Sequence, residues 1–168
     1  NVLNNLGDVA LALEGFEEAQ HFYQESLELH RQRQDLRGMG LALVNLGAVF
    51  ERQGNVQEAK HLFFFFLETA LDLADPYVEN RAITRLAQLA FVTKQFEEAK
   101  NYYQQSFELA SSMGNRAEAA HHARHLGQIA LEKSDFAEAE IYLNQSLSLF
   151  RKLADRVHLS QVLGDLAY

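Results

Sequence analysis

The sequence predicts an all-α fold, a right-handed α-solenoid built from antiparallel helix pairs. The 168 residues contain one proline and nine glycines, which is too little turn chemistry for an all-β fold. Similar residues recur every 40 positions along the chain, a period typical of stacked helical repeats. Each copy also divides into two stretches with apolar residues at helical spacing, as in Ala59, Phe63, Phe66, Leu67 and Ala70.

The repeat is visible as columns of matching residues. Leucine recurs at Leu6, Leu46, Leu86 and Leu126. A Glu-Ala pair recurs at Glu18-Ala19, Glu58-Ala59, Glu98-Ala99 and Glu138-Ala139. Two further columns are apolar: Phe16, Val56, Phe96 and Phe136, then Leu27, Leu67, Phe107 and Leu147. We therefore expect a single repeat domain over 1–168, with copies at about 1–37, 38–76, 77–115 and 116–156 and a partial fifth copy at 157–168.

Turn and capping residues delimit the helices in order along the chain. Within the copies, the turns are expected at Glu14-Gly15, Gly54-Asn55, Gln95 and Ser134-Asp135. Asn55 with Glu58 and Asp135 with Glu138 predict capping boxes, in which a side-chain oxygen accepts an N–H of the first turn. The first helices of later copies are expected after Asp35, Asp75-Pro76, Asn115 and Asp155. The partial fifth copy places Leu163-Gly164 in the Leu-Gly slot, three residues early.

The small residues Gly7, Gly47, Ala87 and Gly127 follow the leucines, and we expect them where helices cross closely, facing the alanines of the Glu-Ala pairs. The order of Leu46-Gly47, Ala59 and then an aromatic residue, Phe63, resembles the tetratricopeptide repeat family. The resemblance covers essentially the whole chain, with Leu143 in the aromatic slot of the fourth copy. The period is longer than the family's usual value of about 34. In this it is similar to repeats of kinesin light chains, spindle-orientation adaptors and the sensor region of the bacterial maltose activator.

The resemblance implies recognition on the concave face, which the first helices of the pairs line. Family members with Asn directly before Leu-Gly clamp a peptide backbone with it, which implies this role for Asn5 and Asn45. The third and fourth copies carry basic and amide side chains on the same predicted surface: Arg81, Arg85, Gln88, His121, Arg124, His125 and Gln128. Because we expect few acidic residues there, these side chains predict a positive groove for carboxylates or an acidic peptide. An ordinary solvated helix face is the alternative.

The run from Phe63 to Phe66 departs from the repeat. Four consecutive helical residues span about 300°, so they cannot all face one core. Phe63 keeps the aromatic core slot, whereas Phe64 and Phe65 are expected near the surface. Exposed neighbouring aromatic residues often mark an interface, here with a partner domain or a second copy of the chain. Alternatively, they fold back over a neighbouring helix.

Composition and motifs argue against several other classes. The net charge of −8 has the wrong sign for a nucleic-acid binder. The longest apolar run, Leu62 to Leu67, is too short to cross a membrane. The absence of cysteine excludes thiol nucleophiles and fits a cytoplasmic protein. His121 and His125 lie one turn apart but lack a convincing third ligand, and no phosphate loop or nucleophile motif occurs. We expect no metal, no cofactor and no enzyme activity.

The sequence thus predicts a non-catalytic scaffold that binds a peptide or partner domain, an acidic one among the candidates, with no role for nucleic acid or membrane. Two alternatives stay open. One is an effector-sensing domain of a bacterial signal-transduction or transcriptional regulator. The other is a self-association module that forms homo-oligomers. Because the chain begins at Asn1 and ends within a first helix, we also expect a piece of a longer protein.

Overall fold

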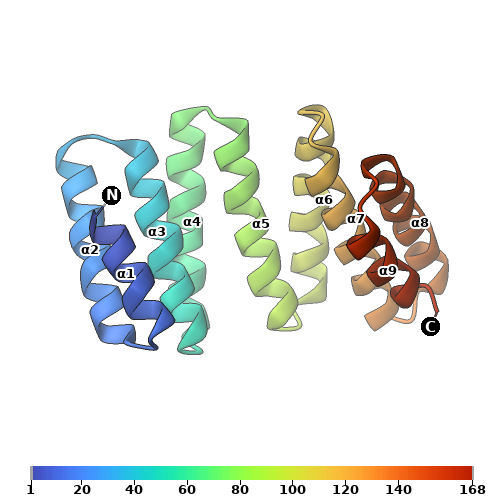
Figure 1. Cartoon of the computed structure of the whole chain (residues 1–168), viewed down its shortest axis with the longest axis horizontal. Helices are drawn as coiled ribbons and strands as arrows, with labels where there is room; N and C mark the ends of the chain where they lie inside the picture. The colour runs from blue at the N-terminus through green and yellow to red at the C-terminus, as the bar shows by residue number, and fades with distance from the viewer. Residues whose placement is uncertain (1, 168) are drawn as a thin grey trace. The chain divides into compact units, whose positions relative to one another are not determined.

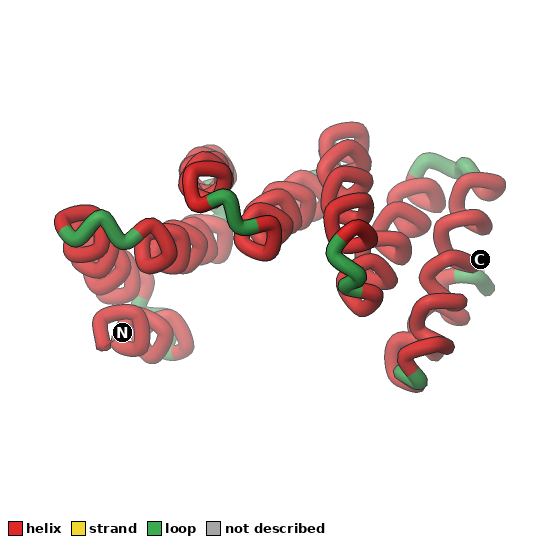
Figure 2. The backbone as a smooth tube through the Cα atoms, turned by 90° about the horizontal axis from the view of Figure 1, so that it is seen from above, coloured by secondary structure: helices red, strands yellow, loops and turns green. Residues whose placement is uncertain are grey.

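The computed structural model describes residues 2–167, so that Asn1 and Tyr168 lie outside the described residues. Within that range the chain forms helices joined by short turns and contains no strand (Figure 2). In chain order the helices are α1 (Val2–Ala12), α2 (Phe16–Gln32), α3 (Leu36–Arg52), α4 (Val56–Leu73), α5 (Pro76–Val92), α6 (Phe96–Ser112), α7 (Arg116–Glu132), α8 (Phe136–Leu153) and α9 (Arg156–Asp165). The predicted all-α architecture of antiparallel helix pairs is therefore confirmed (Figure 1).

The chain divides into two compact units, residues 1–89 and residues 90–168, which we call unit 1 and unit 2. In unit 1, α1 packs on α2, α2 on α3 and α3 on α4. In unit 2, α6 packs on α7, α7 on α8 and α8 on α9. Each of these helices thus packs on its neighbour in sequence, as expected for repeats that bury their apolar faces against adjacent copies.

Capping side chains mark the starts of α3, α7, α8 and α9. Asp35, Asn115, Asp135 and Asp155 each accept a hydrogen bond from the backbone N–H three residues further on. These bonds satisfy donors that the first turn of a helix leaves free. The starts of α2, α4 and α6 have no such bond, and α4 is the one of the three for which a capping side chain, Asn55, was predicted. The capping box predicted at Asn55 is therefore wrong, although the turn itself lies where it was predicted.

The partial fifth copy keeps the 40-residue period. Asp155 caps α9 and lies 40 positions after Asn115, which caps α7. Val162 is fully buried, whereas Leu163 is 51% exposed and a Cβ on Gly164 would meet nothing within 4 Å. The early Leu163-Gly164 register is thus wrong. The physical reason is that the Asp155 cap fixes the phase of the helix and turns Val162 inward.

The glycines after the leucines allow close packing against the aromatic slot of the second helix. A Cβ on Gly7 would clash with the Tyr23 ring, and one on Gly47 would clash with the Phe63 ring. In the fourth copy Gly127 faces Leu143. The predicted close approach is confirmed, but the side chains nearest to the glycines belong to this slot rather than to the alanine column.

One bulky replacement in the core is matched by a small partner. Ser146 of α8 is buried and donates a hydrogen bond to the Ala120 carbonyl of α7 at 2.8 Å. The same slot in α4 holds Phe66, also buried, and its ring lies against Gly40 of α3. Gly40 and Ala120 occupy the same column of the repeat, two periods apart. A glycine at this position therefore makes room for the larger phenylalanine.

Candidate functional site

Each unit presents a candidate surface on its first helices, and in unit 1 the central residue of this surface is Arg85 on α5. The Arg85 guanidinium lies 4.8 Å above the centre of the Phe63 ring, a cation–π distance. It also donates hydrogen bonds to Glu51 of α3 at 2.7 Å and to Gln88 at 3.1 Å. The expectation that acidic residues are scarce is wrong at this arginine. Glu51 balances its charge, and the side chain joins α3, α4 and α5.

The other predicted residues of unit 1 are more open. Asn5 and Arg81 are exposed, and neither forms a hydrogen bond or ion pair with the described residues of the chain. Asn45 is half-buried, and its amide lies 3.5 Å from Asp8. Asp8 accepts a much shorter hydrogen bond, 2.6 Å, from the Tyr23 hydroxyl. Asn5, Asn45 and Arg81 therefore keep donors that a ligand could use.

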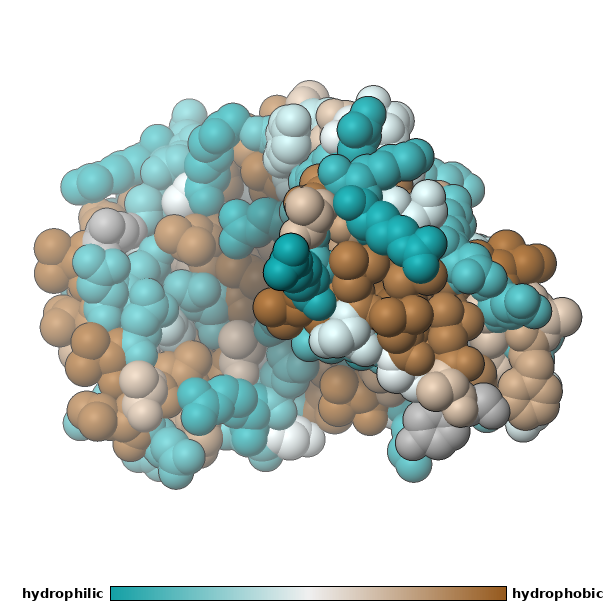
Figure 3. Space-filling view, turned by 45° about the vertical axis from the view of Figure 1, so that its right-hand side comes forward, coloured by the Kyte–Doolittle hydropathy of each residue, from teal (hydrophilic) through white to brown (hydrophobic). Residues whose placement is uncertain are grey.

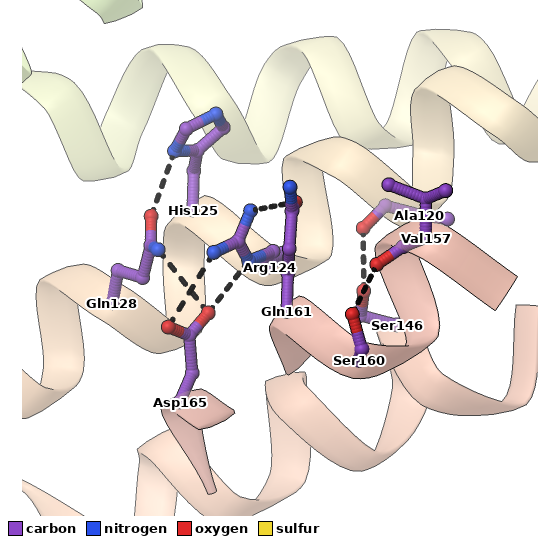
Figure 4. Close-up of polar contacts among 9 residues, drawn as sticks. All are labelled: Ala120, Arg124, His125, Gln128, Ser146, Val157, Ser160, Gln161 and Asp165. Carbon is purple, nitrogen blue, oxygen red and sulfur yellow. Dashed lines mark hydrogen bonds and ion pairs between the residues drawn. The ribbon is translucent and has the colours of Figure 1, made fainter. Parts of the chain in front are cut away.

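In unit 2 the predicted residues join a network between α7 and α9 (Figure 4). Arg124 donates to Asp165 at 2.6 Å and to Gln161 at 2.7 Å. Gln128 donates to Asp165 at 3.2 Å and accepts a hydrogen bond from the His125 ring at 3.0 Å. Asp165 lies outside the predicted set, and it balances Arg124 as Glu51 balances Arg85. The second expected cation is thus also paired.

Burial makes two of the predicted histidines less basic than a free imidazole. His125 stacks on Tyr103 with ring centres 4.7 Å apart, and burial lowers the pKa of His125 to about 4. His121 packs edge-on against Phe150 and His158, with ring centres 5.0 and 4.4 Å away. Burial lowers the pKa of His121 as well, helped by repulsion from His158. The positive groove predicted for copies three and four is therefore largely neutralised in unit 2.

His122 was not among the predicted site residues. It is only 3% exposed, and neither ring nitrogen has a hydrogen-bond partner among the described residues. Its ring centre lies 6.0 Å from that of Tyr103, whose buried hydroxyl also lacks a described partner. Burial lowers the pKa of His122 to about 4. The repeat pattern carries a signal for this residue. The equivalent positions in the second and third copies hold alanine, Ala42 and Ala82, so a histidine here departs from a column of small residues.

An open hollow of about 730 Å³ lies beside the α7–α9 network. Apolar and polar side chains line it: Phe91, Gln128, Leu131, Glu132, Phe136 and Asp165. Phe136 is 63% exposed although it occupies an apolar column of the repeat. On the face that turns this end of the chain forward, apolar side chains gather in a group bordered by hydrophilic ones (Figure 3). The volume is in the range of about 300 to 1,000 Å³ typical of ligand sites.

The phenylalanine run divides between core and surface. Phe63 and Phe66 are buried, whereas Phe64 is 38% exposed and Phe65 is 43% exposed. The prediction that two of the four rings lie at the surface is confirmed. Their exposure leaves part of each ring available for contact, and whether a partner covers them stays a prediction.

Residues 2–167 contain neither a metal-binding cluster nor a membrane-spanning helix. No group of three or more His, Cys, Asp or Glu side chains in that range is arranged to hold a metal ion. The histidine pair predicted as a weak metal candidate, His121 and His125, is engaged with aromatic rings instead. None of the described helices combines the length and apolar character needed to span a bilayer.

Comparison with known sequences gives one family match. A family model described as tetratricopeptide repeat matches residues 1–63 and 79–152, well over half of the chain. No curated protein shows significant sequence similarity to it.

Several solved structures share the fold. BtubC (BKLC) from P. vanneervenii is 20% identical, with a TM-score of 0.88 over 98% of this chain and 68% of its own length. A Signal Transduction ATPase with Numerous Domains protein with a tetratricopeptide repeat sensor, from Pyrococcus horikoshii, is 16% identical, with a TM-score of 0.88 over 98% of this chain and 26% of its own. Aspartyl phosphate phosphatase F from Bacillus subtilis is 12% identical, with a TM-score of 0.88 over 95% and 42%. At these identities the likeness concerns the fold alone.

Proposed function

Because the chain belongs to the tetratricopeptide repeat family, whose fold serves as a scaffold for protein–protein interaction, we propose that it binds a peptide segment or a partner domain on its first-helix surface. We propose that it does so in the cytoplasm and without catalysis. Half-buried polar side chains, of α3 and α5 in unit 1 and of α7 in unit 2, supply donors and acceptors for a peptide backbone within each unit.

The hollow beside α7 is the observation that carries this proposal. Phe91, Leu131 and Phe136 offer an apolar wall, and Gln128 and Asp165 offer an amide and a carboxylate at its edge. Grooves commonly bind a peptide by burying one apolar side chain of the peptide while polar groups at the edge pair with its backbone. We infer that the hollow accepts one apolar side chain of the partner.

The chemistry of the partner differs between the units. In unit 1 the exposed Arg81 can pair with a carboxylate directly, whereas a carboxylate must displace Glu51 to reach Arg85. In unit 2 Asp165 already pairs with Arg124. We therefore propose an acidic group in the partner bound by unit 1 and an apolar residue bound by unit 2. Because Arg81 is exposed, its contribution should weaken as the salt concentration rises.

The hollow also leaves room for the sensing alternative, in which a small effector enters the same space. The hollow is open on one side, which favours a peptide over a small effector, because small-molecule sites usually enclose most of the ligand surface. Self-association is a second proposal, and it depends on the exposed rings of Phe64 and Phe65.

A selection experiment tests the main proposal. Peptides selected from a random library on the immobilised chain would be synthesised, and their dissociation constants measured by fluorescence anisotropy. We expect Phe136→Ala to weaken binding by about tenfold, the cost of losing one apolar anchor. Ile141→Ala is the matched control, since Ile141 is similarly exposed, at 67%, but does not line the hollow.

The same peptides test the basic part of the surface. Arg81→Gln should weaken acidic peptides, whereas Arg33→Gln, another exposed arginine of unit 1, should not. A library that yields no binder, or binders indifferent to both Phe136→Ala and Arg81→Gln, would contradict the proposal. Selective binding of small molecules but not peptides would favour the sensing alternative.

A further inference from the structure

A second open hollow, of about 540 Å³, lies in unit 2 between α6, the start of α7, and α8. We call it the α6–α8 groove, and six of its lining residues carry the argument: Phe107, Ser111, Arg116, Ser148, Leu149 and Lys152. We propose that this groove binds a small organic anion, in which a carboxylate or phosphate group is attached to a short apolar stem. The groove shares no lining residue with the hollow beside α7, so this proposal stands apart from the peptide-binding one.

The lining matches such an anion group by group. Arg116 and Lys152 are exposed cations, and neither forms an ion pair with any described side chain. Ser111 and Ser148 add two hydroxyl donors, and no Asp or Glu lines the groove. A guanidinium, an ammonium and hydroxyl groups are the donors that proteins use for carboxylate and phosphate oxygens.

The apolar part of the ligand has its own contacts. Phe107 and Leu149 are half-buried, so each leaves part of its apolar surface open to the groove. A volume of about 540 Å³ holds a small molecule rather than a single ion. The groove therefore fits an anion that carries a ring or a short aliphatic chain.

The repeat itself shows that this charge pattern is particular to unit 2. Positions 80 residues earlier in unit 1 are the counterparts of the groove residues. There Asp72 replaces Lys152 and Glu68 replaces Ser148. Leu36 replaces Arg116, and Arg31 replaces Ser111. One arginine against two acids gives these unit 1 positions a charge of −1, whereas the two cations give the unit 2 positions +2. The repeat fold alone does not require a cationic groove.

The acidic residue that follows Lys152 in sequence is held by other contacts. Asp155 follows Lys152 by three residues, but its carboxylate contacts the His158 ring at 2.6 Å and accepts the His158 backbone N–H at 3.1 Å. These contacts hold the carboxylate at the start of α9. Lys152 and Arg116 thus remain available to an incoming anion.

The test is an NMR titration of the ¹⁵N-labelled chain with three probes of similar shape: phenyl phosphate, benzoate and neutral phenol. We expect the two anions to shift the amides of residues 107–119 and 145–152 in a saturable way, with phenol binding more weakly. The tighter of the two anions identifies whether phosphate or carboxylate is the preferred group.

Variants assign the effect to the groove. Arg116→Leu combined with Lys152→Asp installs the unit 1 residues and should weaken anion binding by about tenfold. Arg151→Gln removes the positive charge next to Lys152 in sequence, at a residue that does not line the groove, and should leave binding unchanged. Circular dichroism checks the fold of both proteins. Equal binding of phenol and the anions, shifts confined to other surfaces, or full affinity in the double variant would each overturn the proposal.

Discussion

Replacing His122 by leucine should remove much of the acid sensitivity of unit 2. His122 is almost fully buried beside Tyr103, and its ring nitrogens have no described hydrogen-bond partner. Burial, with added repulsion from His125 and His121, lowers the pKa of His122 from 6.5 to about 4. Protonation in the folded state would place a charge in this apolar environment.

The direction of the pH dependence follows from which state, folded or unfolded, binds the proton more tightly. Because the pKa of His122 is lower in the folded state, the unfolded chain takes up the proton first as the pH falls below about 6.5. The free energy of unfolding is therefore highest above that pH and declines until about pH 4. Lowering the pKa of His122 from 6.5 to about 4 can cost the folded state at most about 3 to 4 kcal/mol, because a tenfold change in proton affinity is worth about 1.4 kcal/mol.

Urea unfolding at about pH 7 and about pH 4.5, followed by the NMR signals of α6 and α7, measures the effect. We expect His122→Leu to match or exceed the wild type at neutral pH, because it removes unsatisfied buried nitrogens. Its stability should also fall less on acidification. His21→Leu, at an exposed histidine, is the control and should keep the wild-type pH dependence. An equal loss of stability in His122→Leu and the wild type would refute the reasoning.

Two further predictions concern packing and assembly. Gly47→Ala should cost about 2 kcal/mol or more in a thermal or urea melt, because the new methyl group would collide with Phe63. Gly164→Ala, which meets nothing within 4 Å, should be neutral or stabilising by up to about 1 kcal/mol, and a comparable loss at both sites would contradict the packing argument. If Phe64 and Phe65 form an interface, Phe64→Gln with Phe65→Gln should lower the mass seen by light scattering or weaken partner binding; no change in either would remove the self-association proposal.

The helices and most of their boundaries could be predicted because the sequence itself carries their signals. The 40-residue period gives the order of the helices, and capping residues such as Asp35 and Asn115 mark where they begin. The register predicted at Leu163-Gly164 is wrong because the Asp155 cap, and not the Leu-Gly dipeptide, sets the phase of α9.

The side-chain partners of the site could not be predicted in the same way. Arg85 and Arg124 lie on the expected helices, but their charges are balanced by Glu51 and Asp165 from neighbouring first helices. These partners lie 34 and 41 positions away in sequence. Identifying them requires knowing how the helices pack in three dimensions. The low pKa of His125 likewise depends on burial against Tyr103, which the repeat pattern does not reveal.

The most direct test of the first-helix binding surface is an amide chemical-shift map of the labelled chain with the tightest selected peptide. We predict the largest changes around Gln128 and Phe136 in unit 2, with further changes near Arg81 if the peptide is acidic. Changes confined to outward-facing positions such as Phe64 and Ile141, with none around Gln128, would contradict it.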